Sequence, residues 1–248
     1  MRFESLLRPL LLWTLGVLVS LPPLAVAEAA SPQVQAQAYA SRATSSLLLL
    51  RGEGFQNSHR QRLENDIQTL AAAVQSLPQS SDALRASHLE LVTQLRRGVS
   101  FGPSEDNVPW GYPQELAKAL REFLHAARQL AHAGDSELSA KVEYLAVQYL
   151  SRSYIGSFEI AREQPDTYLG QDERLLVPAV DQELATLDAK ADPALTKLRV
   201  RWEYLKAALS DMNSKSNTLQ SVSGRPFAPI TVDRHSRALT QQWMAQSR

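Results

Sequence analysis

The chain contains no cysteine, and this absence excludes several kinds of site and attachment. A lipoprotein anchor, a c-type haem, a thiolate metal site and a cysteine nucleophile all need the missing thiol. Disulfide bonds are excluded for the same reason, so packing alone must stabilise the fold.

The chain also lacks an excess of basic charge and the glycine-rich loops that bind phosphate. It has 26 basic and 26 acidic side chains, whereas a nucleic-acid-binding domain normally carries a basic excess. Neither G-x-x-x-x-G-K-[ST] nor G-x-G-x-x-G occurs in the sequence. We therefore predict no nucleic-acid partner, and nothing indicates a phosphate-binding loop.

A long hydrophobic run is missing, but a short one stands near the start of the chain. Leu10–Leu21 is apolar, follows Arg2 and Arg8, and is shorter than the roughly 20 residues of an ordinary membrane span. Small residues follow at Ala25 and Ala27, so this order predicts a signal peptide over residues 1–27 that is cleaved before Glu28. The alternative is an uncleaved N-terminal helix that anchors the protein in the membrane.

Export without disulfides suits the periplasm, where we expect residues 28–248 to form one domain. Without residues 1–27, the chain has 24 basic and 25 acidic side chains, so it is nearly neutral. Its length is sufficient to bury a core without covalent staples.

Glycine is scarce, with 10 residues in the whole chain, while strong helix formers dominate the segments between breakers. No alternation typical of a strand extends beyond four residues. The pattern predicts an all-α fold, an antiparallel bundle of about seven to eight helices. The predicted helices cover approximately 31–51, 58–77, 82–97, 113–130, 137–163, 171–190, 193–222 and 232–244.

Two of these helices have especially regular apolar stripes. In the second, gaps of three and four residues connect Leu63 to Leu77, and in the seventh they connect Leu195 to Met212. Trp202 lies in the middle of the stripe of the seventh helix, so we predict that it is buried. In the sixth helix Pro178 predicts a late start or a kink.

Two segments rich in proline, glycine and aromatic residues interrupt the helices. The first, Gly98–Pro113, is longer than most connections in a compact domain. The second, Gly224–Asp233, should be extended between its two prolines. Aromatic residues in such places either close the ends of a bundle or bind a partner; closure is our preferred interpretation, also for Trp110. The candidate binding residues are Phe101, Trp110, Tyr112, Arg225 and Phe227.

Nothing in the sequence indicates catalysis, a cofactor or a metal. His125 and His132 are seven residues apart, which on a helix separates them by about 10 Å, too far to share one ion unaided. No serine next to a histidine lies in a G-x-S-x-G elbow. The series Tyr144, Tyr149 and Tyr154 has a spacing that predicts a buried stripe more than a ligand site.

The leading hypothesis is an exported, soluble helical-bundle protein that acts by binding a small ligand or an envelope protein. Long helices behind a signal peptide are similar in architecture to the periplasmic ligand-sensing bundles of bacterial receptors, although architecture does not fix function. One alternative is a periplasmic hydrolase with dispersed acidic residues. The other is a structural or assembly accessory protein.

Overall fold

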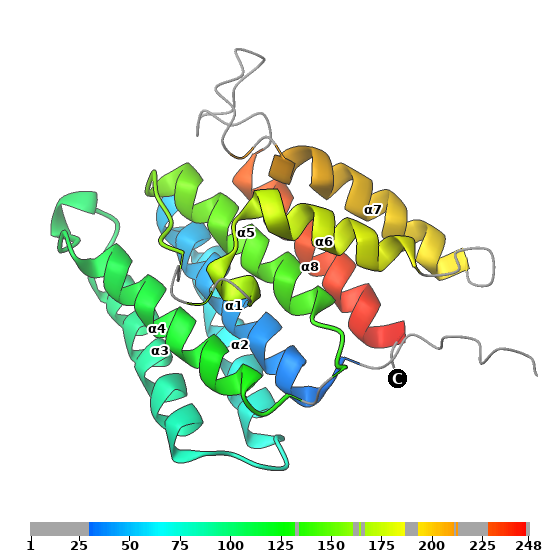
Figure 1. Cartoon of the computed structure of the whole chain (residues 1–248). Coiled ribbons are helices and arrows are strands. Elements are labelled where there is room, and N and C mark those ends of the chain that lie inside the picture. The colour runs from blue at the N-terminus through cyan, green and yellow to red at the C-terminus, as the bar shows by residue number, and fades with distance from the viewer. Residues whose placement is uncertain are drawn as a thin grey trace, which may run out of the picture.

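The all-α prediction is confirmed by a computed structural model, which describes residues 30–131, 134–160, 164, 167–186, 193–210, 212 and 228–246. These residues form eight packed α-helices and no strand (Figure 1). The helices are α1 (Pro32–Gly52), α2 (Asn57–Gln75), α3 (Asp82–Ser100), α4 (Tyr112–Arg128), α5 (Leu138–Tyr154), α6 (Glu173–Ala185), α7 (Pro193–Ser210) and α8 (Pro229–Gln246), with single 3₁₀ turns at Glu105–Asn107 (η1) and Tyr168–Gly170 (η2). The predicted signal peptide, residues 1–27, lies outside the described residues.

Side-chain caps explain where several helices begin. The Ser81 hydroxyl accepts a hydrogen bond from the backbone N–H of Leu84 at 3.1 Å, so it satisfies one free donor of the first turn of α3. The Asp172 carboxylate does the same for Arg174 at 3.0 Å, at the start of α6. Both caps stand where the sequence changes from turn residues to helix formers.

Three predicted boundaries are wrong. Helix α5 ends at Tyr154 instead of about residue 163, because Gly156 adopts a left-handed φ of 87° that stops the helix. Helix α6 begins at Glu173, five residues before Pro178, so this proline does not set its start. The helix ends at Ala185 instead of about residue 190. Helix α8 begins at Pro229, where extended chain was expected, because proline suits the first helical turn. Residues 213–222, predicted to continue the seventh helix, lie outside the described residues.

The predicted apolar stripes form the core. All five apolar positions of the second helix pattern are buried, as are Leu195, Met212 and the stripe positions between them. Trp202 is 1% exposed, which confirms its predicted burial. Its indole Nε1–H donates to the Asp181 carboxylate of α6 at 3.0 Å, so this side chain joins α6 and α7.

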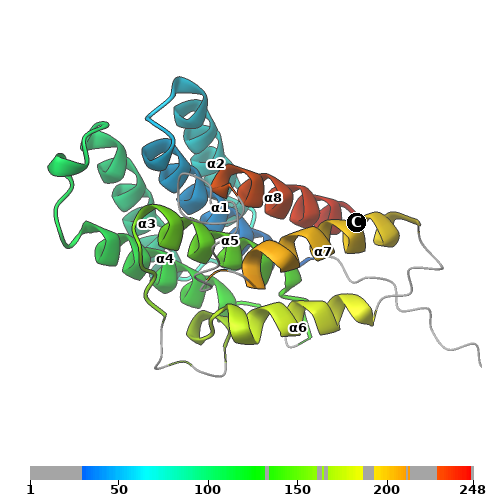
Figure 2. The same cartoon turned by 90° about the horizontal axis from the view of Figure 1, so that it is seen from above.

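Helix α1 lies at the centre of the bundle. Its sequence pattern does not predict this position. It packs against α2, α3, α4, α5 and α8, and nearly all its residues from Gln33 to Leu50 are buried. Figure 1 shows α3 and α4 on one side of it and α6 and α7 on the other, and Figure 2 shows α2 and α6 on opposite faces of the molecule. Because α1 is covered all round, its polar side chains must find partners within the protein.

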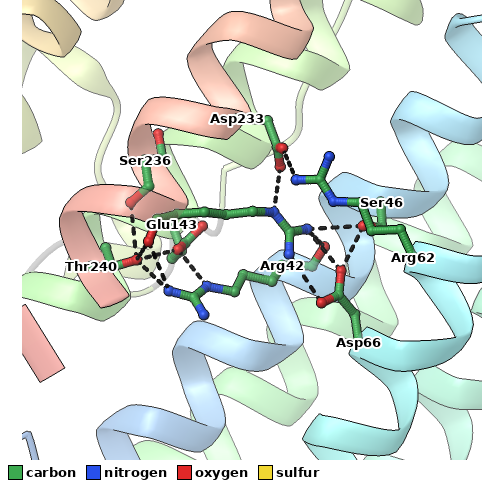
Figure 3. A network of polar contacts seen from close by, with 9 residues as sticks. Arg42, Ser46, Arg62, Asp66, Glu143, Asp233, Ser236 and Thr240 are labelled. Atoms are coloured by element: carbon green, nitrogen blue, oxygen red, sulfur yellow. Dashed lines mark hydrogen bonds and ion pairs between the residues drawn. The ribbon is translucent and has the colours of Figure 1, made fainter. Parts of the chain in front are cut away.

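A buried polar network supplies partners for two of them, Arg42 and Ser46 (Figure 3). The guanidinium of Arg42 in α1 donates to the Glu143 carboxylate of α5 at 2.6 Å and to the Thr240 hydroxyl of α8 at 2.5 Å. The Arg237 guanidinium of α8 donates to Asp66 of α2 at 3.0 Å and to Ser46 of α1 at 2.9 Å. The network therefore joins α1 to three other helices, α2, α5 and α8.

The charges of this network balance. Three guanidinium groups face three carboxylates, and the side chains of Glu143 and Asp233 have no exposed surface. Buried charges are tolerated when they are paired in this way. The six charged residues are Arg42, Arg62, Asp66, Glu143, Asp233 and Arg237.

Candidate functional site

The segment between α3 and α4 and the start of α8 border one cavity of about 860 Å³. Residues 105–113 contribute one wall and residues 228–230 another, while the C-terminal ends of α1 and α5 close the space between them. In Figure 1 these helix ends, the loop between α3 and α4, and the start of α8 all lie towards the top of the view. The described lining residues are Leu47, Leu48, Arg51, Gly52, Glu53, Glu105, Val108, Tyr112, Pro113, Leu116, Ser153, Tyr154, Ile155, Ala228, Pro229 and Ile230.

The lining of the cavity changes from a buried apolar floor to a partly exposed mouth. Leu47, Leu48 and Leu116 are buried and belong to the core. Ile155 and Ile230 are 41% and 39% exposed, so apolar surface continues to the mouth. A cavity of this volume with mostly apolar walls and a few polar groups is typical of small-molecule sites, which span roughly 300–1,000 Å³.

Arg51 holds the first irregular segment against the end of α1. Its Nη1 donates to the backbone carbonyls of Gly98 at 2.8 Å and Gly102 at 3.1 Å, and its Nη2 lies 2.9 Å from the Glu105 carboxylate. The two carbonyls belong to the last turn of α3 and the residues after it, where the helix itself offers no donors. The Arg51 guanidinium thus satisfies carbonyl groups at the end of α3 and holds the segment that forms one wall of the cavity.

Tyr112 forms the part of that wall nearest the core. Its ring meets Phe101 edge to face, with ring centroids 5.0 Å apart, and its hydroxyl donates to the Gln94 carbonyl at 2.8 Å. Burial raises the pKa of the Tyr112 hydroxyl well above its ordinary value. The Arg97 guanidinium lies 5.6 Å from the centroid of the Phe101 ring and 5.7 Å from that of the Tyr112 ring. These cation–π contacts stabilise the pair of rings.

Tyr154 and Glu53 form the polar side of the cavity. The Tyr154 hydroxyl donates to the Glu53 carboxylate, although the two residues are 101 positions apart. Burial, and then the hydrogen bond to Glu53, raise the pKa of Tyr154. The ring passes so close to Gly52 that a Cβ there would lie 2.3 Å from it, so only glycine permits this approach.

The five candidate binding residues that the sequence suggested do not share one location in the structure. Tyr112 lines the cavity, and Phe101 is half-buried behind it. Trp110 is 91% exposed, so the expectation that it closes the end of the bundle is wrong; the turn between Pro109 and Gly111 presents its side chain to solvent. Arg225 and Phe227 lie outside the described residues.

Sequence reasoning missed Glu53 and Tyr154. Glu53 stands in Gly52-Glu53-Gly54, which indicates only the end of a helix, and Tyr154 continues a tyrosine series that predicts core. Tyr144 and Tyr149 of that series are indeed buried, whereas Tyr154 is half-buried at the cavity. The one local signal was the carboxylate of Glu53 between two glycines, next to Phe55.

A second hollow, of about 690 Å³, lies between α3 and α4. It is open and lined by polar side chains, among them Glu90, Arg121, Glu122 and His125. No group of three or more metal-binding side chains occurs within the described part of the chain, and His132 lies outside it. This hollow lacks the apolar floor and the enclosed walls of the cavity at α1.

Comparison with family models, with curated proteins and with solved structures finds no match to this chain. Among the helices that the structure describes, none has both the length and the apolar character needed to cross a bilayer.

Proposed function

We propose that the chain is an exported helical binding protein that holds a small, mainly apolar molecule in the cavity beside Tyr112 and Tyr154. The observation that carries the proposal is the meeting of the segment between α3 and α4 with the start of α8 at one cavity of about 860 Å³. Helical packing alone does not require a hollow of this size, because protein interiors are normally close-packed. The continuity of apolar surface from Leu48 to the mouth at Ile230 supports an apolar ligand.

Export is part of the same proposal. The signal peptide predicted over residues 1–27 would place the binding protein in the periplasm, where the mature chain begins at Glu28. N-terminal sequencing of the protein released by osmotic shock tests this location. Recovery of chains that still begin at Met1 in the membrane fraction would contradict it.

A fluorescent apolar probe tests binding in the cavity. N-phenyl-1-naphthylamine, excited where tryptophan does not absorb, should fluoresce strongly in the presence of the protein. Ile230→Trp places a large side chain at the mouth, so it should weaken probe binding by about tenfold or more. Leu89→Trp is the matched control, because Leu89 is 67% exposed on α3 and does not line the cavity. Equal probe affinity in both variants would contradict the proposal.

A second candidate function, recognition of an envelope protein, rests on Trp110. Its 91% exposure between Pro109 and Gly111 presents a rigid aromatic side chain of the kind that anchors protein interfaces. Capture of one defined partner by the wild type and not by Trp110→Ala, with probe binding unchanged, would favour this function over the cavity. Capture that survives the substitution would count against it.

A further inference from the structure

We infer that the ligand of the cavity carries a positively charged amine or ammonium group, which binds between the Glu53 carboxylate and the Tyr154 ring while its apolar part lies on the leucine floor. The inference rests on the proposed function, because it names the chemical class of ligand for the same cavity. It is carried by the imbalance of charge among the lining residues.

Glu53 is the unbalanced charge. Within the described residues its carboxylate accepts a hydrogen bond from Tyr154 and forms no ion pair. A carboxylate offers about four acceptor positions, so most of its capacity is unused. A half-buried carboxylate without a cation is electrostatically incomplete, and a charged amine would supply both the missing charge and the missing donors.

The other lining charges cancel. Arg51 has a side chain that is 9% exposed, and its donors are engaged by two backbone carbonyls and by Glu105. The Arg51–Glu105 pair is therefore neutral and leaves no free guanidinium to attract an anion. Two helix C-terminal ends, of α1 and α5, and two N-terminal ends, of α4 and α8, border the cavity, so their dipoles offset one another.

Aromatic rings and apolar walls complete the site. Tyr112 and Tyr154 both line the cavity, and a tyrosine ring attracts an organic cation over its face. Leu47, Leu48 and Leu116 form an apolar surface that fits a hydrocarbon chain or ring. The combination selects an amphiphilic cation over a small hydrophilic amine, because only the former covers the floor.

A matched series of ten-carbon probes tests the charge. Decylammonium, decanol and decanoate, each below its micelle concentration, are titrated against protein loaded with N-phenyl-1-naphthylamine. Decylammonium should displace the probe at a concentration about tenfold or more below that of decanol, the usual scale of a charge-assisted hydrogen bond, and decanoate should be the weakest. Glu53→Gln should remove the difference between decylammonium and decanol, because the amide keeps the acceptor for Tyr154 but not the charge.

The control is Glu203→Gln, which removes the same charge from an exposed position on α7 outside the cavity and should keep the preference for decylammonium. Equal displacement by all three probes would overturn the inference and leave the cavity proposal intact. Stronger displacement by decanoate, or an unchanged preference in Glu53→Gln, would also overturn it. If N-phenyl-1-naphthylamine itself fails to bind, the proposed function fails and the inference with it.

Discussion

The Nε of Arg42 lies 2.6 Å from the Glu143 carboxylate, in a part of the bundle where the Glu143 side chain has no exposed surface. The pair joins the central helix α1 to α5, and Thr240 of α8 contacts both partners. Glu143 Oε2 accepts no hydrogen bond within the described residues. The pair therefore links three helices, α1, α5 and α8. Removal of one charge without the other should lower the stability of the fold.

Removal of Arg42 alone should strongly destabilise the protein. Arg42→Met leaves the Glu143 carboxylate buried without a cation, so we expect a loss of about 3–5 kcal/mol in the free energy of unfolding, measured by urea denaturation. The double variant Arg42→Met/Glu143→Met removes both charges, and Thr240 keeps its bond to the Ser236 carbonyl at 3.0 Å. The double variant should be more stable than Arg42→Met, and a simple sum of the two single losses would contradict this account.

Trp202 and Trp110 should respond in opposite ways to truncation. Trp202 is buried and holds Asp181 across α6 and α7, so Trp202→Ala should reduce the free energy of unfolding by about 3–5 kcal/mol. Trp110 is exposed, so Trp110→Ala should change the free energy of unfolding by no more than about 0.5 kcal/mol. Parallel urea titrations make the comparison, and similar losses in the two variants would show that one of them is misplaced.

Gly98 should be intolerant of a side chain, although it lies inside a helix. A Cβ at Gly98 would meet the Tyr112 hydroxyl at 2.2 Å and Leu47 at 2.8 Å, so Gly98→Ala must displace the wall of the cavity. We expect a loss of stability of about 1–3 kcal/mol and weaker binding of N-phenyl-1-naphthylamine. Gly111→Ala is the control, because its nearest neighbour would be Glu115 at 3.8 Å. A stabilised Gly98→Ala protein with normal probe binding would refute this packing.

Four tyrosines should resist ionisation in the folded protein. Burial raises the pKa of Tyr112, Tyr144, Tyr154 and Tyr168 above the unfolded value of 10.0. The stabilisation that this shift gives is complete below pH 10 and declines as the pH rises further, because the unfolded chain then loses protons that the folded chain keeps. An ultraviolet titration should show these four ionising only as the protein unfolds. One transition of all seven tyrosines near pH 10, with the fold intact, would contradict their burial.

Local patterns predict the helices well and the site only in part. Regular stripes such as the one through Trp202 are sufficient to predict which face is buried, because each helix shows its own periodicity. The central position of α1 has no such signal, since its buried positions include Gln37, Ser41 and Arg42, which are polar. The partners of Arg42, Glu143 and Thr240, lie 101 and 198 positions away from it, and only the packed bundle brings them together.

The candidate site shows the same limit. Proline, glycine and aromatic residues mark the two irregular segments, and both segments border the cavity as neighbours. The role of each aromatic residue depends on tertiary packing instead. Gly98 leaves room for the Tyr112 ring to turn inward, while Trp110, two residues before Tyr112, is exposed. Glu53 and Tyr154 become a site only because α1 and α5 end side by side.

A crystal structure of the protein with bound N-phenyl-1-naphthylamine tests directly whether the cavity between the α3–α4 segment and the start of α8 is the binding site. We expect the aromatic rings of the probe to lie in van der Waals contact with Leu48 and Leu116, between Tyr154 and Ile230. Probe found in the hollow between α3 and α4 or against Trp110, with this cavity unoccupied, would contradict it.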